Sequence, residues 1–226
     1  MRDRFAEVAG RLLDEDTRLT LVLADIGVSK FDELGVTARH PDRVVNVGIR
    51  EQLMIGDAAG MALEGLRPIV HSYTPFLVER PFEQIKLDLG HQDVGAVLVS
   101  IGASYDAADS GRTHQAPEDV ALLASLPGWH IDVPGHYAAT VRPFDGETLR
   151  AELGDATDVV LVEPYLTGTS SGVTAKAPEE TPHRLLALGV DEPELRKYGT
   201  PRQHRAAHGL DAPGLATSIK RFIRVG

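Results

Sequence analysis

The stretch Val44–Gly65 reads VVNVGIREQLMIGDAAGMALEG, an apolar run followed by a segment rich in alanine, methionine and leucine. The run Arg43–Val47 predicts a short buried strand, and the composition of Arg50–Glu64 predicts a helix that Gly65 ends. Glu51 therefore lies in the first turn of a helix that directly follows a strand. A strand that leads at once into a helix is typical of sheets whose strands run parallel.

The same alternation continues on both sides of this stretch. Strands are predicted over residues 19–26, 67–73 and 94–101, and helices over 5–13, 82–89 and 117–126. Apolar strands between helices indicate an α/β fold with a parallel sheet covered by helices on both faces. Ligands of such sheets bind at the carboxyl ends of the strands, so function is expected in the loops after Ala24, Val47, Ser72 and Ile101.

The second half of the chain continues the pattern less regularly. Gly102–Gln115 is predicted to be a long functional loop, and Thr167–Glu180 is predicted to be a loop because it is rich in Thr, Ser, Gly and Pro. Strands are expected over 158–162 and 184–190, and helices over 145–153 and 213–223.

Composition argues against several classes of protein. The 226 residues carry a formal net charge of −10 from scattered acids, whereas a general nucleic-acid binder is basic. No apolar run reaches the roughly 20 residues that span a bilayer, so no membrane association is predicted and the cytoplasm is the expected compartment. Without cysteine, disulfides and thiolate nucleophiles are excluded. The nine histidines show no metal-ligand spacing, so no metal site is predicted in this chain.

Single residues near the predicted loops each allow a structural and a functional interpretation. Glu51 could be a first-turn acid that favours the helix dipole, and Tyr73 and Phe76 could be core aromatics. Asp25, at the end of the first strand, could be a turn former, and His114 could be a solvated loop residue. Position alone does not separate the two interpretations.

Several separated motifs agree in order and spacing with one family. The strings VVNVGIREQLMIGDAAGMALEGLRPIVHSYTPFLVERPFEQIKLDLGHQ, from Val44, and GRTHQAPEDVALLASLPGW, from Gly111, closely resemble the pyrimidine-binding domain of transketolases. The resemblance covers roughly Arg4–Pro134. It implies a chain that helps to bind thiamine diphosphate, a cofactor that serves as an electron sink when a carbon–carbon bond is cleaved.

The resemblance also assigns roles to residues. By motif match, Glu51 is the buried carboxylate that hydrogen-bonds the aminopyrimidine ring nitrogen and so supports removal of the C2 proton. Tyr73 and Phe76 match the aromatic residues around that ring. Asp25 and Ser29, in Asp-Ile-Gly-Val-Ser, resemble the family's turn at the thiazolium edge and the substrate channel.

Two further residues are implied to meet the substrate. His114, in Gly-Arg-Thr-His-Gln, matches the family histidine that faces the reacting carbons. Arg112, in the same loop, could contact an anionic group of the substrate or could be an ordinary surface arginine. Ile49 and Leu53, which flank Glu51, are expected to serve general packing.

Two departures from the family pattern bear on partners and domains. No Gly-Asp-Gly run, which in the family precedes the magnesium motif, occurs here. The diphosphate and Mg²⁺ are therefore expected to be bound mainly by a diphosphate-binding partner subunit, as in split transketolases, in a hetero-oligomer expected to be α2β2. The second departure is that Ile131–Pro134 is followed almost at once by Arg142–Asp145, which resembles the family's carboxyl-terminal domain. The expected organisation is a pyrimidine-binding domain over 1–140 and a shortened carboxyl-terminal domain over 141–226.

The resemblance implies an enzyme that works only with a partner chain. It would transfer a ketol or related two-carbon unit from a ketose or 2-oxo acid donor to an aldehyde acceptor. One alternative is the β-like subunit of a 2-oxo acid decarboxylase or dehydrogenase, although the Gly-Ile-Arg-Glu-Gln and Thr-His-Gln motifs favour transketolase. The other alternative is a non-catalytic assembly partner, against which the joint presence of Glu51, Tyr73, Phe76 and His114 argues.

Overall fold

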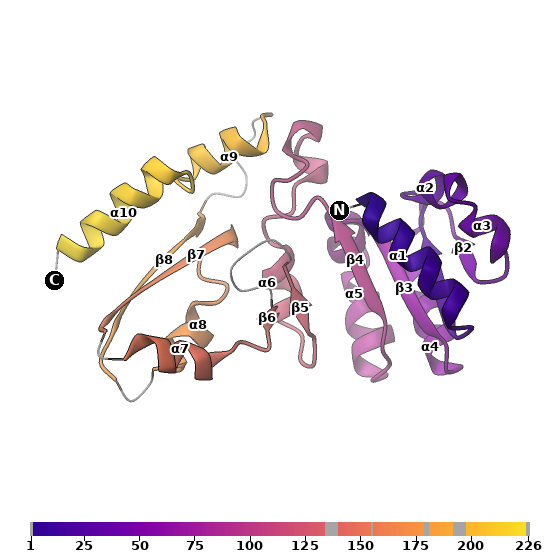
Figure 1. The fold of residues 1–226 in the computed structure, drawn as a ribbon, viewed down its shortest axis with the longest axis horizontal. Coiled ribbons are helices and arrows are strands. Elements are labelled where there is room, and N and C mark those ends of the chain that lie inside the picture. The colour runs from indigo at the N-terminus through magenta and orange to yellow at the C-terminus, as the bar shows by residue number, and fades with distance from the viewer. Residues whose placement is uncertain (1, 134–139, 155, 179–180, 192–197, 225–226) are drawn as a thin grey trace. The chain divides into compact units, whose positions relative to one another are not determined.

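The computed structural model of the chain describes residues 2–133, 140–154, 156–178, 181–191 and 198–224 (Figure 1). The chain consists of two compact units, Met1–Ala103 and Ser104–Gly226. These units differ from the family domains expected from the sequence, whose boundary after residue 140 stays a prediction.

The first unit is built on a four-stranded sheet in which every neighbouring pair of strands is parallel. Its strands are β1 (Leu19–Leu23), β2 (Val44–Asn46), β3 (Arg67–Tyr73) and β4 (Val97–Ile101), in the order β2-β1-β3-β4. The register places Leu21 opposite both Val44 and Ile69. The predicted α/β fold with a parallel sheet is confirmed, although β4 is a half-exposed edge strand rather than a buried one.

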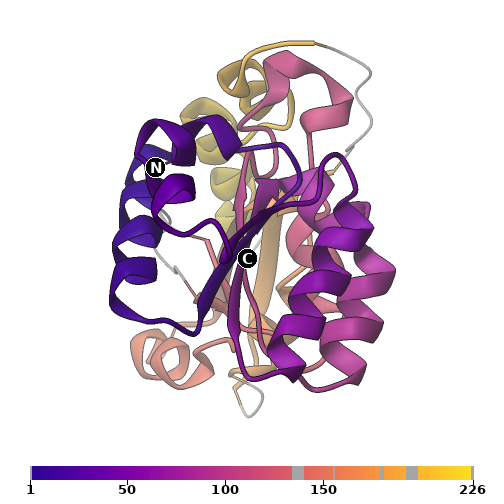
Figure 2. The ribbon, with the colours of Figure 1, turned by 90° about the vertical axis from the view of Figure 1, so that its right-hand side faces the viewer.

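Helices cover both faces of this sheet, as Figure 2 shows with α1 on one side and α4 on the other. The helical elements are α1 (Arg2–Glu15), α2 (Val28–Glu33), α3 (Val36–Arg39), α4 (Glu51–Leu63), α5 (Phe82–Gln84) and the π-helices η1 (Pro75–Glu79) and η2 (Ile85–His91). On the α1 side, Phe31, Leu13 and Leu21 belong to a fully buried apolar cluster. On the α4 side, Met54 and Ile55 are fully buried.

The carboxyl ends of β1, β2 and β3 lie at one edge of the sheet because these three strands are parallel neighbours. The turn after β1 passes over the buried side chain of His71, and a Cβ added at Gly27 would lie 2.9 Å from that ring. Gly27 also has φ of 92°, so only glycine suits this position. Fold and sequence together therefore bring the segments that contain Asp25, Glu51 and Tyr73 to the same edge.

The second unit contains two small sheets. Antiparallel β5 (Ile131–Asp132) and β6 (Thr140–Arg142) form one, and parallel β7 (Asp158–Leu166) and β8 (Arg184–Val190) form the other. Its helices are η3 (Ala108–Ser110), η4 (Arg112–His114), α6 (Asp119–Ala124), α7 (Gly146–Leu153), α8 (Ser171–Lys176), α9 (Pro201–Ala207) and α10 (Ala212–Arg224). No helix in the described ranges is long and apolar enough to cross a bilayer.

One sequence-based expectation needs correction, and two others gain detail from the structure. Thr167–Glu180, predicted to be a loop, contains helix α8, because the buried carboxylate of Glu163 accepts hydrogen bonds from the backbone N–H groups of Gly168 and Ser170 and so fixes the turn before the helix. The helix predicted over 82–89 continues as the π-helix η2. The predicted loop Gly102–Gln115 includes the short 3₁₀ turns η3 and η4.

Candidate functional site

Glu51 is the first residue of α4, and its backbone position follows from the turn at Gly48, which has φ of 72°. Its side chain is only 5% exposed, an unusual setting for a carboxylate. Oε1 accepts a hydrogen bond of 2.8 Å from the Nη1 of Arg80, whose side chain is 43% exposed. The buried acid is therefore satisfied by an arginine that reaches it from the solvent side.

An aromatic pair is linked to this carboxylate through Arg80. Tyr73 ends β3 and Phe76 lies in η1, with ring centroids 6.2 Å apart and planes inclined by 77°, an edge-to-face arrangement. Arg80 lies four residues after Phe76, and its Cζ is 3.9 Å from the centre of the Phe76 ring. One guanidinium thus hydrogen-bonds Glu51 and stacks on Phe76 at the same time.

These residues fit the aminopyrimidine ring that the resemblance implies. That ring is flat and, when protonated at its ring nitrogen, presents an N–H donor, as the guanidinium of Arg80 does. The structure already holds such a group between the carboxylate of Glu51 and the face of Phe76. The carboxylate of Glu51 and the face of Phe76 thus suit a flat cationic donor. Glu51 is linked to Phe76 through Arg80, and Phe76 contacts Tyr73, while the roles expected for the three residues stay predictions.

Asp25 lies at the same edge of the sheet in a strained turn. Its φ of 61° is in the left-handed region, which non-glycine residues seldom adopt. Asn46 holds it there: the Asp25 backbone N–H donates to Asn46 Oδ1, and Asn46 Nδ2 donates to Asp25 Oδ1, both at 3.0 Å. The backbone N–H of Gly48 donates to Asn46 Oδ1 at 3.1 Å. Asn46 therefore couples the turn after β1 to the turn that precedes Glu51.

Ser29 and the two apolar neighbours of Glu51 are all exposed in this chain. Ser29 lies in the first turn of α2. Ile49 is 71% exposed and Leu53 is 44% exposed, so the expectation that they serve general packing is wrong for the chain by itself. Met54 and Ile55 lie on the buried face of α4, and helical geometry places Leu53 on its exposed face.

His114 and Arg112 belong to the second unit, in η4. His114 is half-buried, and its Nδ1 lies 3.0 Å from Thr113 Oγ1. The guanidinium of Arg112 donates to the carboxylate of Glu118 and to the backbone carbonyl of Gln115, both at 2.8 Å. Arg112 is thus engaged within its own loop, and its contact with a substrate anion stays a prediction.

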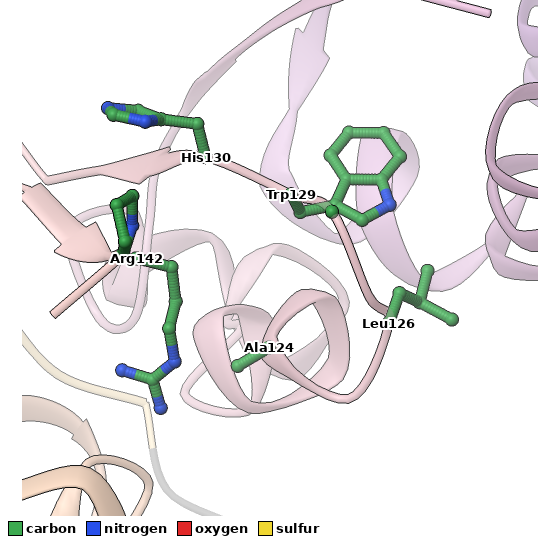
Figure 3. Close-up of a pocket in the computed structure, with 7 residues that line it drawn as sticks. Ala124, Leu126, Trp129, His130 and Arg142 are labelled. Carbon is green, nitrogen blue, oxygen red and sulfur yellow. The ribbon is translucent and has the colours of Figure 1, made fainter. Parts of the chain in front are cut away.

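A cavity of about 360 Å³ in the second unit contains none of the predicted site residues (Figure 3). It is lined by Ala124, Leu126, Gly128, Trp129, His130, Arg142 and Pro143. Arg142 also donates to the backbone carbonyl of Thr169 at 3.1 Å. Within the described residues, no three His, Cys, Asp or Glu side chains are gathered to hold a metal ion.

Sequence reasoning missed Arg80 and Asn46, both of which contact predicted site residues. The spacing of Phe76 and Arg80, four residues apart in an apolar-then-charged segment, is a signal for a shared helix face. Asn46 gives a weaker signal, because its partner Asp25 is 21 residues away and meets it only through the pairing of β1 with β2.

Comparison with known proteins assigns a family. The profile described as "Transketolase, pyrimidine binding domain" matches residues 1–164. An uncharacterized 33.6 kDa protein in the fasciation locus of Rhodococcoides fascians is 39% identical over 293 positions, covering 97% of this chain and 93% of that protein. Because 293 positions exceed the 226 residues here, the relative has residues inside the matched region that this chain lacks.

Other relatives are longer enzymes. The 1-deoxy-D-xylulose-5-phosphate synthase of Paenarthrobacter aurescens is 35% identical over 156 residues, which cover 67% of this chain. The matched region is 21% of that synthase, so the chain spans about a fifth of its length.

Two solved structures show the fold. A split-gene transketolase, described as an inactive β4 tetramer, aligns with a TM-score of 0.80 at 20% identity and with 97% of each chain covered. The transketolase of Campylobacter jejuni aligns with a TM-score of 0.67 at 14% identity, covering 97% of this chain and 46% of that one.

Proposed function

The chain belongs to the transketolase family through its pyrimidine-binding domain, and from that premise we propose that it is one subunit of a two-component enzyme dependent on thiamine diphosphate. The proposed reaction transfers a ketol or related two-carbon unit from a ketose or 2-oxo acid donor to an aldehyde acceptor. The observation that carries the proposal is the buried carboxylate of Glu51, hydrogen-bonded to a flat cationic donor beside the ring of Phe76.

Each residue of the first unit has a distinct task in this proposal. When bound, thiamine diphosphate supplies the electron sink for cleavage of a carbon–carbon bond. Glu51 accepts the hydrogen bond of the aminopyrimidine ring nitrogen and holds the proton there, while Phe76 and Tyr73 form an apolar wall that orients the ring and excludes water. Asp25, fixed by Asn46, contributes at the thiazolium edge beside Ser29.

His114 and Arg112 are proposed to handle the substrate. His114 would donate or accept a proton at the oxygen atoms of the reacting carbons, and its half-buried ring leaves a face for that contact. Arg112 would position an anionic group, for which it would have to exchange its bond to Glu118.

A partner subunit completes the proposed enzyme. This chain lacks the Gly-Asp-Gly run, so the diphosphate and Mg²⁺ are assigned mainly to a diphosphate-binding partner, and an α2β2 assembly is proposed. Two comparisons support this. The chain aligns with 46% of the Campylobacter transketolase, and the β chains of a split-gene transketolase are described as an inactive tetramer.

The test is proton exchange at C2 of the cofactor, followed by NMR in the complex with the diphosphate-binding chain. Glu51→Gln keeps the size of the side chain but removes the carboxylate, and exchange should slow by at least about 100-fold, the lower end for a positioned acid–base group. His114→Ala is the control, because it should slow turnover and leave exchange largely intact. Unchanged exchange in Glu51→Gln would remove this residue from the mechanism.

A second candidate is favoured by the relatives named 1-deoxy-D-xylulose-5-phosphate synthase. A 1-deoxy sugar has a methyl group at C1, so the two-carbon unit in its formation is acetyl rather than ketol. A 2-oxo acid donor would then release carbon dioxide. Because a ketol transferase with a 2-oxo acid donor also releases carbon dioxide, the C1 group of the product separates the candidates: a methyl group for this one, a hydroxymethyl group for the ketol transferase.

A further inference from the structure

Arg80 covers the two groups that the cofactor ring would need. Its Nη1 donates to Glu51 Oε1 at 2.8 Å, and its Cζ lies 3.9 Å above the Phe76 ring. Glu51 is 5% exposed and Phe76 is 9% exposed, while Arg80 itself is 43% exposed. The guanidinium therefore lies between solvent and both groups.

The backbone of Arg80 is anchored by hydrogen bonds, whereas its side chain is 43% exposed. Its N–H donates to the carbonyl of Pro75 at 3.1 Å, the i to i−5 bond of the π-helix η1. Its carbonyl accepts a bond of 3.2 Å from Gln52 Nε2, on the residue next to Glu51. Rotation of side-chain bonds alone can thus remove the guanidinium without moving η1 or α4.

We propose that Arg80 occupies the aminopyrimidine site of the free subunit, and that the pyrimidine ring of thiamine binds there by displacing the guanidinium. This rests on the proposed function. A flat, positively charged N–H donor stacked on Phe76 and bonded to Glu51 meets the same two demands as the cofactor ring.

The arrangement has a physical reason. A buried carboxylate with no partner is costly, so a chain that must exist before it meets its cofactor requires a temporary partner for Glu51. Because the ring has to break the ion pair and the stacking, a free pyrimidine should bind weakly to the isolated subunit. The diphosphate and Mg²⁺ anchors of the assembled enzyme would provide the binding free energy that displaces Arg80.

The test uses the isolated full chain and two probes, thiamine and 4-amino-5-hydroxymethyl-2-methylpyrimidine, titrated by NMR. Arg80→Met removes the charge and donors and keeps a flexible apolar side chain, so the pyrimidine should bind about tenfold more tightly. That factor corresponds to losing one partly exposed ion pair and one cation–π contact. Arg50→Met is the matched control, because Arg50 is an exposed arginine adjacent to Glu51, and it should change affinity less than twofold.

Two further measurements separate the possible failures. The double variant Glu51→Gln/Arg80→Met should lose most of the tenfold gain in pyrimidine affinity. Because it leaves no buried unpaired charge, it also tests binding if Arg80→Met alone folds poorly. In the wild-type chain, millimolar pyrimidine should shift the Nε–H signal of Arg80, since the guanidinium is released. Equal or weaker binding by Arg80→Met, or no binding by any variant, would overturn the inference. If this inference fails but the assembled enzyme still requires Glu51 for C2 exchange, the proposed function would stand without the inference.

Discussion

Removing the side chain of Asn46 should destabilise the first unit and release Asp25. Asn46 makes three hydrogen bonds, from the N–H groups of Asp25 and Gly48 and to the Asp25 carboxylate. Asn46 is exposed, so each bond is assigned about 0.5 kcal/mol, the low end of the range, and Asn46→Ala should cost about 1.5 kcal/mol. The left-handed backbone of Asp25, with φ of 61°, would then lack the contacts that hold it.

Asn46→Asp makes the sharper test, because it keeps both acceptor bonds and loses only the donor. It also places two exposed carboxylates about 3 Å apart, a repulsion of roughly 1 kcal/mol in water. Its destabilisation should therefore be about 1.5 kcal/mol at low salt and should shrink toward about 0.5 kcal/mol in 1 M salt, whereas that of Asn46→Ala should not change.

Urea unfolding followed by far-UV circular dichroism measures these free energies. The single tryptophan, Trp129, belongs to the second unit, so its fluorescence transition serves as an internal control that should not move. In an Asp25→Gly background the carboxylate partner is absent and glycine accepts the positive φ, so Asn46→Asp should cost almost nothing. An equal cost of Asn46→Asp in both backgrounds would refute the pairing of Asn46 with Asp25.

Two further predictions concern the second unit. His204 stacks on Tyr105 with ring centroids 4.4 Å apart, and burial lowers its pKa, so the unfolded chain binds a proton at this histidine more readily than the folded chain does. The contribution of His204 to stability should be complete above pH 6.5 and should fall as the pH drops through the lowered pKa. His204→Phe should flatten that loss in acid-unfolding curves. Glu163→Ala removes two hydrogen bonds that backbone N–H groups donate to a buried carboxylate, so it should cost about 3 kcal/mol or more, whereas Glu163→Gln should cost less. Equal losses for the two variants in urea unfolding would contradict the bonding assigned to Glu163.

Much of the first unit could be predicted because its signals are local. Gly48 and Gly65 mark the two ends of α4, which was expected over 50–64 and runs from Glu51 to Leu63. Strand β3 begins and ends at the residues predicted. Helix α9 was missed, although Thr200-Pro201-Arg202-Gln203 carries the signature of a capping box that the structure contains.

The candidate site could be predicted only in part. Glu51 and Phe76 both contact Arg80, and Phe76 contacts Tyr73, while the roles expected for the three residues stay predictions. Arg80 was not identified, because its contact with Glu51 joins residues 29 positions apart, and the spacing of Phe76 and Arg80 signals only that these two share a face. Pairings of this kind arise from tertiary geometry rather than from local propensity.

The strand order β2-β1-β3-β4 has a consequence for how the protein is made on the ribosome. The inner strands β1 and β3 can pair as soon as Tyr73 has emerged, but the outer edge of β3 has no neighbour until Val97–Ile101 has been translated. At cellular translation speeds that interval is on the order of seconds. During it an apolar strand edge is open to pairing with other nascent chains, so codons that slow synthesis between β3 and β4 would favour aggregation over correct closure of the sheet.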